Sequence, residues 1–289
     1  MEKITVDYKS GNNFTLKGDL YPATEKSSPV IVYIHGGGLF WGSREDLKNE
    51  QLSFYHQAGY TVFSIDYRLA PESKLADISE DIASALDWVE NEGSKLYDYD
   101  PGKIAVIGGS AGAYLALLSG TFKKKPQAIV SFYGYGDISG AWATKPSPHY
   151  TQMKSVPKEL AQSLVGDKIV SVGPIGKRYA LYMYARQQGC WSKDISGLHP
   201  IWDKQQLLSF CPLKHVDESF PPTLLLHGTE DEDVPYQQSV LMAEKLASAG
   251  VPSKLITIPE GKHVFDEDWD KPVVREAFGE VIRFLGEHL

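Results

Sequence analysis

Apolar and polar residues follow two different patterns in the predicted strands of this chain. Residues 2–8 and 14–21 alternate between apolar and polar around a Gly-Asn-Asn turn, which predicts an antiparallel hairpin. Later strands are instead short, continuous apolar runs, the pattern of a sheet that is covered on both faces. These runs are residues 30–34, 61–65, 104–107, 128–133, 223–226 and 254–258.

Helical patterns separate these strands. Between residues 77 and 89 the apolar positions recur at the spacing of one helical face. The other predicted helices of this series are residues 52–58, 113–118, 237–249 and 273–289. Strands that alternate with helices in this way predict an α/β fold with a mainly parallel central sheet and helices on both faces.

The alternation stops between residues 134 and 222. This stretch has prolines, a clear helical pattern only at residues 177–188, and many aromatic residues. Such a long interruption predicts an inserted cap or lid, with residues 1–133 and 223–289 forming the core domain. We expect the aromatic residues to cover a site and form an apolar acyl or aryl pocket, the alternative being that they pack a small core of the insert itself. They are Tyr135, Trp142, Tyr150, Tyr179, Tyr182, Tyr184, Trp191 and Trp202.

Charge and composition narrow the function classes. The 289 residues carry a net charge of −8, and the one basic cluster, residues 123–125, ends a predicted helix, so a nucleic-acid partner is not expected. Cys190 and Cys211 lack the spacing of a disulfide scaffold or a metal site, and we expect buried free thiols in a reducing cytosol. Residues 1–22 are polar and alternating, so we expect neither a signal peptide nor a membrane-spanning run there. The sequence therefore predicts a cytoplasmic protein without a membrane partner.

One stretch combines a strand, a tight turn and a helix around a serine. Residues 104–107 form the strand, Ser110 lies in the sequence Gly-Gly-Ser-Ala-Gly, and helical composition begins directly afterwards. A G-x-S-x-G turn in this context is a nucleophile elbow, whose strained backbone tolerates only small neighbours. The amide of Ala111 then lies at a helix N-terminus, where negative charge is favoured. The alternative is an ordinary glycine-rich connection between a strand and a helix.

A serine nucleophile needs a base and an acid that orients the base. His263 follows the last predicted strand, where the base of such an arrangement is expected. The acidic loop after the strand at 223–226 offers Asp231 as first choice and Asp233 as second. Asp137, which follows the strand that ends at residue 133, is a third candidate.

Three glycines follow His35 at the end of the strand at residues 30–34. Glycine amides can approach a ligand closely because no Cβ intervenes, and Gly37, Gly38 and Ala111 are the expected donors to an oxyanion. A phosphate-binding loop is the alternative, but neither G-x-G-x-x-G nor a P-loop lysine is present. No metal-hydrolase motif occurs either, so we expect no cofactor or metal.

Five motifs together carry a family resemblance. They are HGGG at 35–38, DYRLAPE at 66–72, GGSAGA at 108–113, HGTEDEDVP at 227–235 and EGKHVF at 260–265. In order and spacing they resemble the hormone-sensitive-lipase-like branch of the α/β-hydrolases and the neighbouring small bacterial esterases and deacetylases. Glycine at 109 and alanine at 113 fit the esterase and deacetylase side better than the lipase side.

This resemblance implies a role for each matched residue. Ser110 would be the nucleophile, His263 the base and Asp231 the acid. Gly37, Gly38 and Ala111 would be the oxyanion donors. The residues Asp66, Arg68 and Glu72 of the DYRLAPE motif would be scaffold residues that brace loops below the site.

The resulting hypothesis is a serine carboxylesterase or deacetylase that acts through an acyl-enzyme on small, short-chain or aryl esters. The same machinery could act on an amide, as in arylformamidase-like or peptidase-like relatives. A third option is a ligand-binding module that kept the fold and lost catalysis, although such receptors lack the histidine found here at 263. The expected partner is a small-molecule ester, and the oligomeric state stays open, a homodimer being one option.

Overall fold

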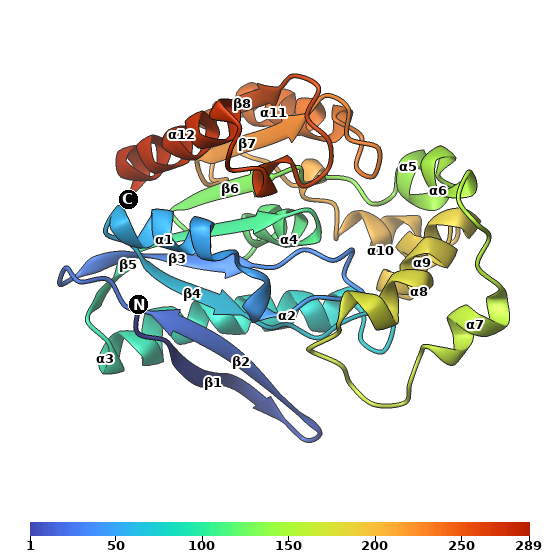
Figure 1. The fold of residues 1–289 in the computed structure, drawn as a ribbon, viewed down its shortest axis with the longest axis horizontal. Coiled ribbons are helices and arrows are strands. Elements are labelled where there is room, and N and C mark those ends of the chain that lie inside the picture. Colours follow the sequence, from blue (N-terminus) through green and yellow to red (C-terminus); the bar gives the residue numbers. More distant parts are fainter.

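A single sheet of eight strands forms the centre of the protein (Figure 1). The computed structural model describes residues 1–289. The strands are β1 (Ile4–Gly11), β2 (Phe14–Tyr21), β3 (Ser28–Ile34), β4 (Thr61–Ile65), β5 (Tyr99–Gly109), β6 (Ala128–Phe132), β7 (Thr223–Gly228) and β8 (Ser253–Ile258). Their order is β1-β2-β4-β3-β5-β6-β7-β8. β1 pairs antiparallel with β2, and β2 with β4, whereas every other neighbouring pair is parallel. The predicted hairpin and parallel sheet are confirmed.

Helices cover both faces of this sheet. On one face lie α1 (Asn49–Gln57) and α12 (Pro272–His288), and on the other lie α2 (Leu75–Trp88), α4 (Ala111–Ser119) and α11 (Gln237–Ser248). Neighbouring residues of β3 point to opposite faces, as the pleat requires. Ile31 therefore belongs to the apolar cluster that contains Phe278 of α12, and Val32 belongs to the separate cluster that contains Leu115 of α4. Most buried residues of β3, β4, β5 and β6 are apolar for this reason, and Ser64 and Ser131 are polar exceptions.

The remaining short elements lie in connections. They are η1 (Arg44–Asp46) before α1, η2 (Val89–Gly93) and α3 (Ser94–Leu96) after α2, and η4 (Phe265–Glu267) before α12. None of the helices is both long and apolar enough to cross a lipid bilayer. The two cysteines are free, as predicted, but only Cys211 is buried and Cys190 is half-buried.

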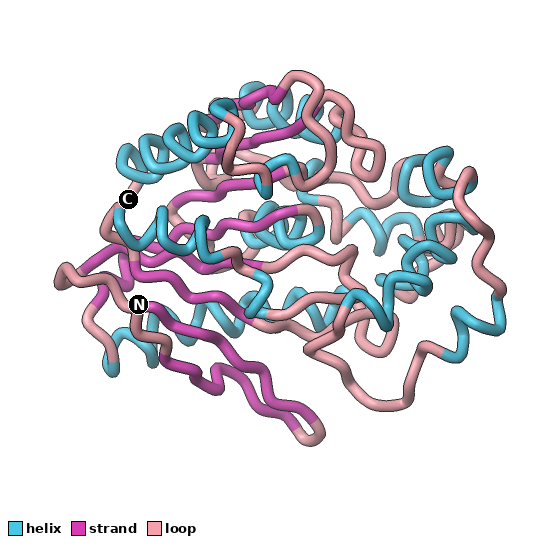
Figure 2. Tube along the Cα trace, viewed as in Figure 1, coloured by secondary structure: helices cyan, strands magenta, loops and turns pink.

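Residues 134–222, here called the β6–β7 segment, contain helices and no strand (Figure 2). Its helices are α5 (Ala141–Thr144), α6 (Pro148–Thr151), α7 (Lys158–Ser163), α8 (Ile175–Gln188), α9 (Trp191–Ser196), α10 (Lys204–Leu208) and η3 (Pro212–Lys214). Figure 1 shows that these helices lie at the end of the sheet toward which the parallel strands point. Catalytic and binding sites of open α/β sheets form at this end.

Part of the aromatic content of the β6–β7 segment forms a local core that is continuous with the large apolar cluster on the α2 and α4 face of the sheet. The rings of Tyr135, Trp142 and Trp191 contact one another with centroids 5.0–5.6 Å apart. Trp191 also donates a 3.0 Å hydrogen bond from Nε1 to the carbonyl of Gly38, so this core is tied to the loop after β3. Trp202, in contrast, is 81% exposed.

The three charged residues of the DYRLAPE motif form ion pairs. Asp66 accepts from Arg44 at 2.7 Å, and Arg68 pairs with Asp81 of α2 at 2.8 Å. These contacts join β4 to η1 and α2. Such positions fit the scaffold role that the resemblance implies.

Glu72, the last residue of that motif, connects the core to the β6–β7 segment. Its carboxylate accepts from Arg178 of α8 at 2.6 and 3.0 Å, and both side chains are more than nine-tenths buried. Arg178 also donates to the carbonyls of Ala70 and Phe40. One buried guanidinium thus fastens α8 to two loops of the core.

Replacing Glu72 by alanine should destabilise the protein strongly, because Arg178 would remain buried without its counter-charge. We expect the free energy of unfolding to fall by about 3 kcal/mol, measured by urea denaturation followed by circular dichroism. The control is Glu92→Ala, which breaks an exposed pair with Lys95 and should cost less than about 0.5 kcal/mol. Equal losses for the two variants would show that the buried pair does not hold α8 to the core.

Candidate active site

Ser110 lies at the sharp turn between β5 and α4. Its backbone has φ 55° and ψ −117°, a conformation that a residue with a side chain rarely adopts. The turn is tight because a Cβ on Gly112 would lie 2.0 Å from the carbonyl oxygen of Ile34. A Cβ on Gly108 would likewise lie 2.3 Å from the carbonyl carbon of Gly112. Glycine at both positions lets α4 start directly against β3, and this packing holds the serine at the end of the sheet.

The structure brings Ser110, His263 and Asp231 together in one hydrogen-bonded row. Nε2 of His263 is 3.0 Å from Oγ of Ser110. Nδ1 of the same ring is 2.7 Å from Oδ2 of Asp231. The three residues come from the β5–α4 turn, the loop after β8 and the loop after β7, so distant parts of the sequence meet here.

Asp231 is held as an anion by donors on both of its oxygens. Its Oδ1 accepts from the amides of Asp233 and Val234, each at 2.9 Å. Its Oδ2 lies 3.2 Å from Nε2 of His227 as well as near His263. Burial alone would raise the pKa of Asp231, but the hydrogen bonds to the two histidines outweigh it and hold that pKa well below its ordinary value.

His263 is polarised by carboxylates on several sides. Burial would lower the pKa of His263, yet the hydrogen bond to Asp231 and the charge of Asp233 raise it above the ordinary value of about 6.5. Asp266 is a further carboxylate near the ring, and burial raises its pKa to about 6. The Asp266 carboxylate accepts a 2.7 Å hydrogen bond from Tyr133, whose ring packs edge-on against His263 at 4.8 Å.

Neither of the other two candidate acids contacts Nδ1 of His263. Asp137 accepts from the amide and hydroxyl of Ser139 and makes no contact with His263. Asp233 is close to His263, but its Oδ2 is 3.8 Å from Nε2, the nitrogen that faces Ser110, and not from Nδ1. Only Asp231 therefore occupies the position from which a carboxylate orients the imidazole toward the serine.

Three backbone amides near Ser110 have no acceptor in the protein. They belong to Gly37, Gly38 and Ala111, and none donates to another backbone or side-chain oxygen. Gly37 and Gly38 have φ of 96° and 59°. These positive angles turn the chain sharply, so that a tight loop follows β3. That loop is closed by the amides of Phe40 and Trp41, which donate to the carbonyl of Gly37 at 2.9 and 3.1 Å. Free amides at such a site are suited to hold an oxyanion.

A cavity of about 860 Å³ opens over Ser110 and His263. Its walls come from the core and from the β6–β7 segment, which contributes Tyr150, Val172, Ile175 and Tyr179. Val172 and Ile175 are more than half exposed and form an apolar rim. The aromatic residues of the segment are thus divided between two roles, because some line this cavity and others pack the local core described above.

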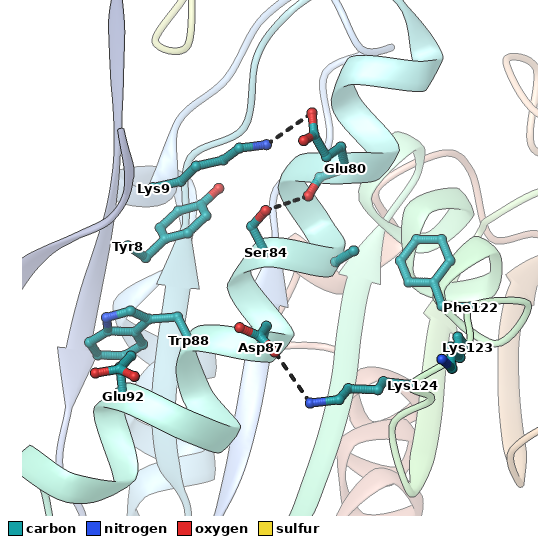
Figure 3. Close-up of a pocket in the computed structure, with 11 residues that line it drawn as sticks. Tyr8, Lys9, Glu80, Ser84, Asp87, Trp88, Glu92, Phe122, Lys123 and Lys124 are labelled. Atoms are coloured by element: carbon teal, nitrogen blue, oxygen red, sulfur yellow. Dashed lines mark hydrogen bonds and ion pairs between the residues drawn. The ribbon is translucent and has the colours of Figure 1, made fainter. Parts of the chain in front are cut away.

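A second cavity, of about 500 Å³, lies between β1, α2 and the end of α4 (Figure 3). Several of its charged residues form ion pairs: Lys9 pairs with Glu80 at 3.2 Å, and Lys124 pairs with Asp87 at 3.2 Å. Figure 3 shows that Ser84 is bonded back to its own helix, with its hydroxyl on the carbonyl of Glu80. This cavity contains no serine paired with a base. No group of three or more His, Cys, Asp or Glu side chains in the protein is arranged to hold a metal ion.

The structure explains why residue 109 is a glycine, which the sequence alone does not. A Cβ at this position would lie 2.8 Å from the hydroxyl and 3.2 Å from the ring of Tyr133. Tyr133 therefore occupies the space that a larger residue before the serine would need. The same tyrosine carries the hydrogen bond to Asp266.

Sequence reasoning missed several residues that shape the site. His227 is not among the site residues predicted from the sequence, but it is buried and supports Asp231. Tyr182 and Arg186 of α8 contact Asp233. The i, i+4, i+8 spacing of Arg178, Tyr182 and Arg186 was the available signal, because it places three polar side chains on one face of a helix.

Comparison with solved structures defines the fold class. A protein of unknown function from Staphylococcus aureus is 26% identical, with 99% of both chains covered and a TM-score of 0.82. An α/β-hydrolase superfamily protein from Enterococcus faecalis is 25% identical, again over 99% of both chains, with a TM-score of 0.79. Esterase 2 of Thermogutta terrifontis is 21% identical over 99% of this chain and 94% of its own, with a TM-score of 0.71. The protein therefore has the α/β-hydrolase fold.

The family is given by the sequence. The BD-FAE family model matches residues 19–246, which is most of the chain, and the protein belongs to the BD-FAE family. Curated relatives include a non-reducing polyketide synthase of Aspergillus terreus, which is 30% identical over 91% of this chain. This chain spans only 13% of the length of that synthase.

The strain at Ser110 predicts an unusual order of stability among its variants. Ser110→Gly should be more stable than Ser110→Ala by about 1 kcal/mol, because glycine adopts the observed φ without a steric penalty. The same pair of substitutions at Ser163, exposed at the end of α7, should show the opposite order. Thermal or urea unfolding measures both pairs. A less stable glycine variant at position 110 would contradict a strained turn.

Proposed function

We propose that the protein is a serine carboxylesterase in which Ser110, His263 and Asp231 act as the catalytic triad. The observation that carries this proposal is the hydrogen-bonded row from Asp231 through both nitrogens of His263 to the serine hydroxyl. This row lies beside three unpartnered amides and under an open cavity. A nucleophile, a base, an orienting acid and an oxyanion site are the parts that acyl transfer requires.

In the proposed reaction, Oγ of Ser110 attacks the ester carbonyl while Nε2 of His263 takes the hydroxyl proton. The amides of Gly37, Gly38 and Ala111 hold the oxyanion of the tetrahedral intermediate. The anionic Asp231 stabilises the imidazolium, which then gives its proton to the leaving alcohol. Water repeats the sequence on the acyl-enzyme, releases the acid and restores the serine. No metal or cofactor takes part in these steps.

The lining of the cavity supports the proposal that the substrates are small esters with a short acyl or an aryl group. Its walls carry aromatic rings from Trp41, Tyr133 and Tyr179, and its outer rim is the apolar pair Val172 and Ile175. Two proteins of the same fold also support small acyl groups. Esterase 2 of Thermogutta terrifontis has been determined with propionate bound, and an acetyl ester-xyloside hydrolase comes from Caldicellulosiruptor lactoaceticus. We propose the β6–β7 segment as the cap that forms the outer wall.

A fluorophosphonate probe tests the nucleophile directly. We expect the probe to label the wild-type protein at Ser110, identified by peptide mass spectrometry, and to leave Ser110→Ala unlabelled. Ser84, whose hydroxyl faces no base, provides the matched control, and Ser84→Ala should be labelled as fully as the wild type. A folded wild-type protein that resists the probe would contradict the esterase proposal and favour a binding module.

The length of the acyl chain should affect turnover. We expect kcat/KM to be higher for p-nitrophenyl acetate and butyrate than for the octanoate, as the proposed preference for short acyl groups requires. Steady-state hydrolysis at a fixed pH measures the three esters, with Ser110→Ala as the blank. Faster turnover of the octanoate would overturn the short-chain assignment while leaving the triad in place. Parallel assays with the matching anilides compare ester with amide cleavage.

A further inference from the structure

Asp233 is a second carboxylate beside His263, and the proposed mechanism does not use it. Its Oδ2 is 3.8 Å from Nε2 of His263 and accepts no hydrogen bond from the protein. Its side chain is only 16% exposed, yet it lines the cavity above Ser110. A carboxylate in this position faces the nitrogen that exchanges the proton with serine and leaving group.

Two residues of α8 hold Asp233 in place. The hydroxyl of Tyr182 donates to Oδ1 at 2.7 Å, and Nη2 of Arg186 donates to the backbone carbonyl at 3.0 Å. Nη2 of Arg186 is also 3.7 Å from the carboxylate. Tyr182 donates to Oδ1 of Asp233, so the other oxygen, Oδ2, has no hydrogen bond and faces His263.

The guanidinium of Arg186 is held mainly by aromatic rings and by few hydrogen bonds. It is buried, and its Nε and Nη1 have no hydrogen-bond partner. Four aromatic rings surround its guanidinium at 5.1–5.8 Å from the ring centroids, and they belong to Trp142, Tyr150, Tyr182 and Trp191. Cation–π contacts of this kind are favourable for a desolvated cation. Asp233 is the only carboxylate that forms an ion pair with Arg186, and its negative charge stabilises the buried guanidinium at this position of α8.

Tyr182 touches the oxyanion loop as well as Asp233. A Cβ on Gly38 would lie 2.6 Å from the Tyr182 ring, so the ring packs directly on this glycine. One side chain of the β6–β7 segment therefore contacts both the loop of the unpartnered amides and the loop of the acid. The β6–β7 segment therefore lines the cavity and also contacts the loops that carry the proposed catalytic groups.

We propose that Tyr182 and Arg186 of α8 hold Asp233 as a second carboxylate against the Nε2 side of His263. Through Asp233, the β6–β7 segment then helps to set how strongly the protonated form of His263 is stabilised. Asp231 stabilises the imidazolium from the Nδ1 side, and Asp233 stabilises it from the opposite side. This inference rests on the proposed function, since it concerns the proton that His263 carries during acyl transfer. Asp233 acts through His263 and is a positioning residue.

The groups that face His263 come from four parts of the chain. Asp231 and Asp233 belong to the loop after β7, Asp266 to η4, Tyr133 to the end of β6 and Ser110 to the turn before α4. The three carboxylates all favour the protonated ring and raise the pKa of His263. Removing the charge of Asp233 must therefore lower that pKa, and the neutral, active form of the base will persist to lower pH.

The test compares the pH dependence of kcat/KM for p-nitrophenyl acetate in the wild type and in Asp233→Asn. The acid limb should move to lower pH by about half a unit or more, and the plateau should fall about three- to tenfold because the imidazolium loses support. Glu232→Gln is the matched control, since Glu232 is the adjacent carboxylate but faces His149 at 3.7 Å. Its acid limb should stay in place.

A second pair of variants tests the role of α8. Tyr182→Phe removes the hydrogen bond to Asp233 and keeps the ring on Gly38, and it should shift the acid limb in the same direction by a smaller amount. Tyr184→Phe on the same helix, where the hydroxyl makes no hydrogen bond in the protein, should shift nothing. Circular dichroism and thermal unfolding establish that each variant is folded. An unmoved or raised acid limb in both Asp233→Asn and Tyr182→Phe would overturn the inference.

An NMR titration of His263 separates this inference from the proposed function. In the Ser110→Ala background, which has no turnover, the pKa of His263 should be lower when Asp233→Asn is added. The same pKa with and without Asp233 would overturn the inference, whatever the enzyme does. A wild-type protein that hydrolyses no ester would instead contradict the proposed function, and this titration would still decide the role of Asp233.

Discussion

The rest of the site depends on one steric constraint, the close packing of the β5–α4 turn against the end of β3. Gly112 lies so near the carbonyl of Ile34 that no Cβ fits between them. This contact fixes where α4 begins, and with it the strained Ser110 and the free amide of Ala111. Because β3 continues directly into Gly37 and Gly38, the same contact places the serine and the three amides around one point. Geometry of this kind is set before any ligand binds, as preorganised acyl transfer requires.

The acidic side of the site depends on hydrogen bonds and charge. Two histidines and two amides keep Asp231 ionised in a buried position, and Asp231 in turn orients His263. The β6–β7 segment contributes to the same network through α8. Arg178 fastens that helix to Glu72, and one and two turns later Tyr182 and Arg186 reach Asp233. The β6–β7 segment, which forms a wall of the cavity, is thus also joined to the loop that carries Asp231.

Much of this arrangement could be predicted from the sequence, for physical reasons. The apolar runs of the strands and the G-x-S-x-G turn are local signals, and they predicted the sheet and the elbow. The order of serine, acid and histidine after β5, β7 and β8 predicted that Ser110 and His263 meet, with Asp231 as the first choice of acid. The loop after β7 left Asp231 and Asp233 unresolved, because which ring nitrogen each carboxylate faces depends on contacts from α8 and not on spacing. Tyr133 and the aromatic cage of Arg186 were missed for the same reason, since each depends on packing between distant segments.

The central claim is that Ser110 becomes acylated during turnover. The most direct measurement is the mass of the protein after acid quenching of a reaction with p-nitrophenyl butyrate, followed by peptide mapping. We expect a fraction of the protein to be heavier by one butyryl group, carried by Ser110. This fraction should be larger when hydrolysis of the acyl-enzyme is slowed at low pH. Steady ester hydrolysis with no butyryl group on Ser110, or with the group on another residue, would contradict it.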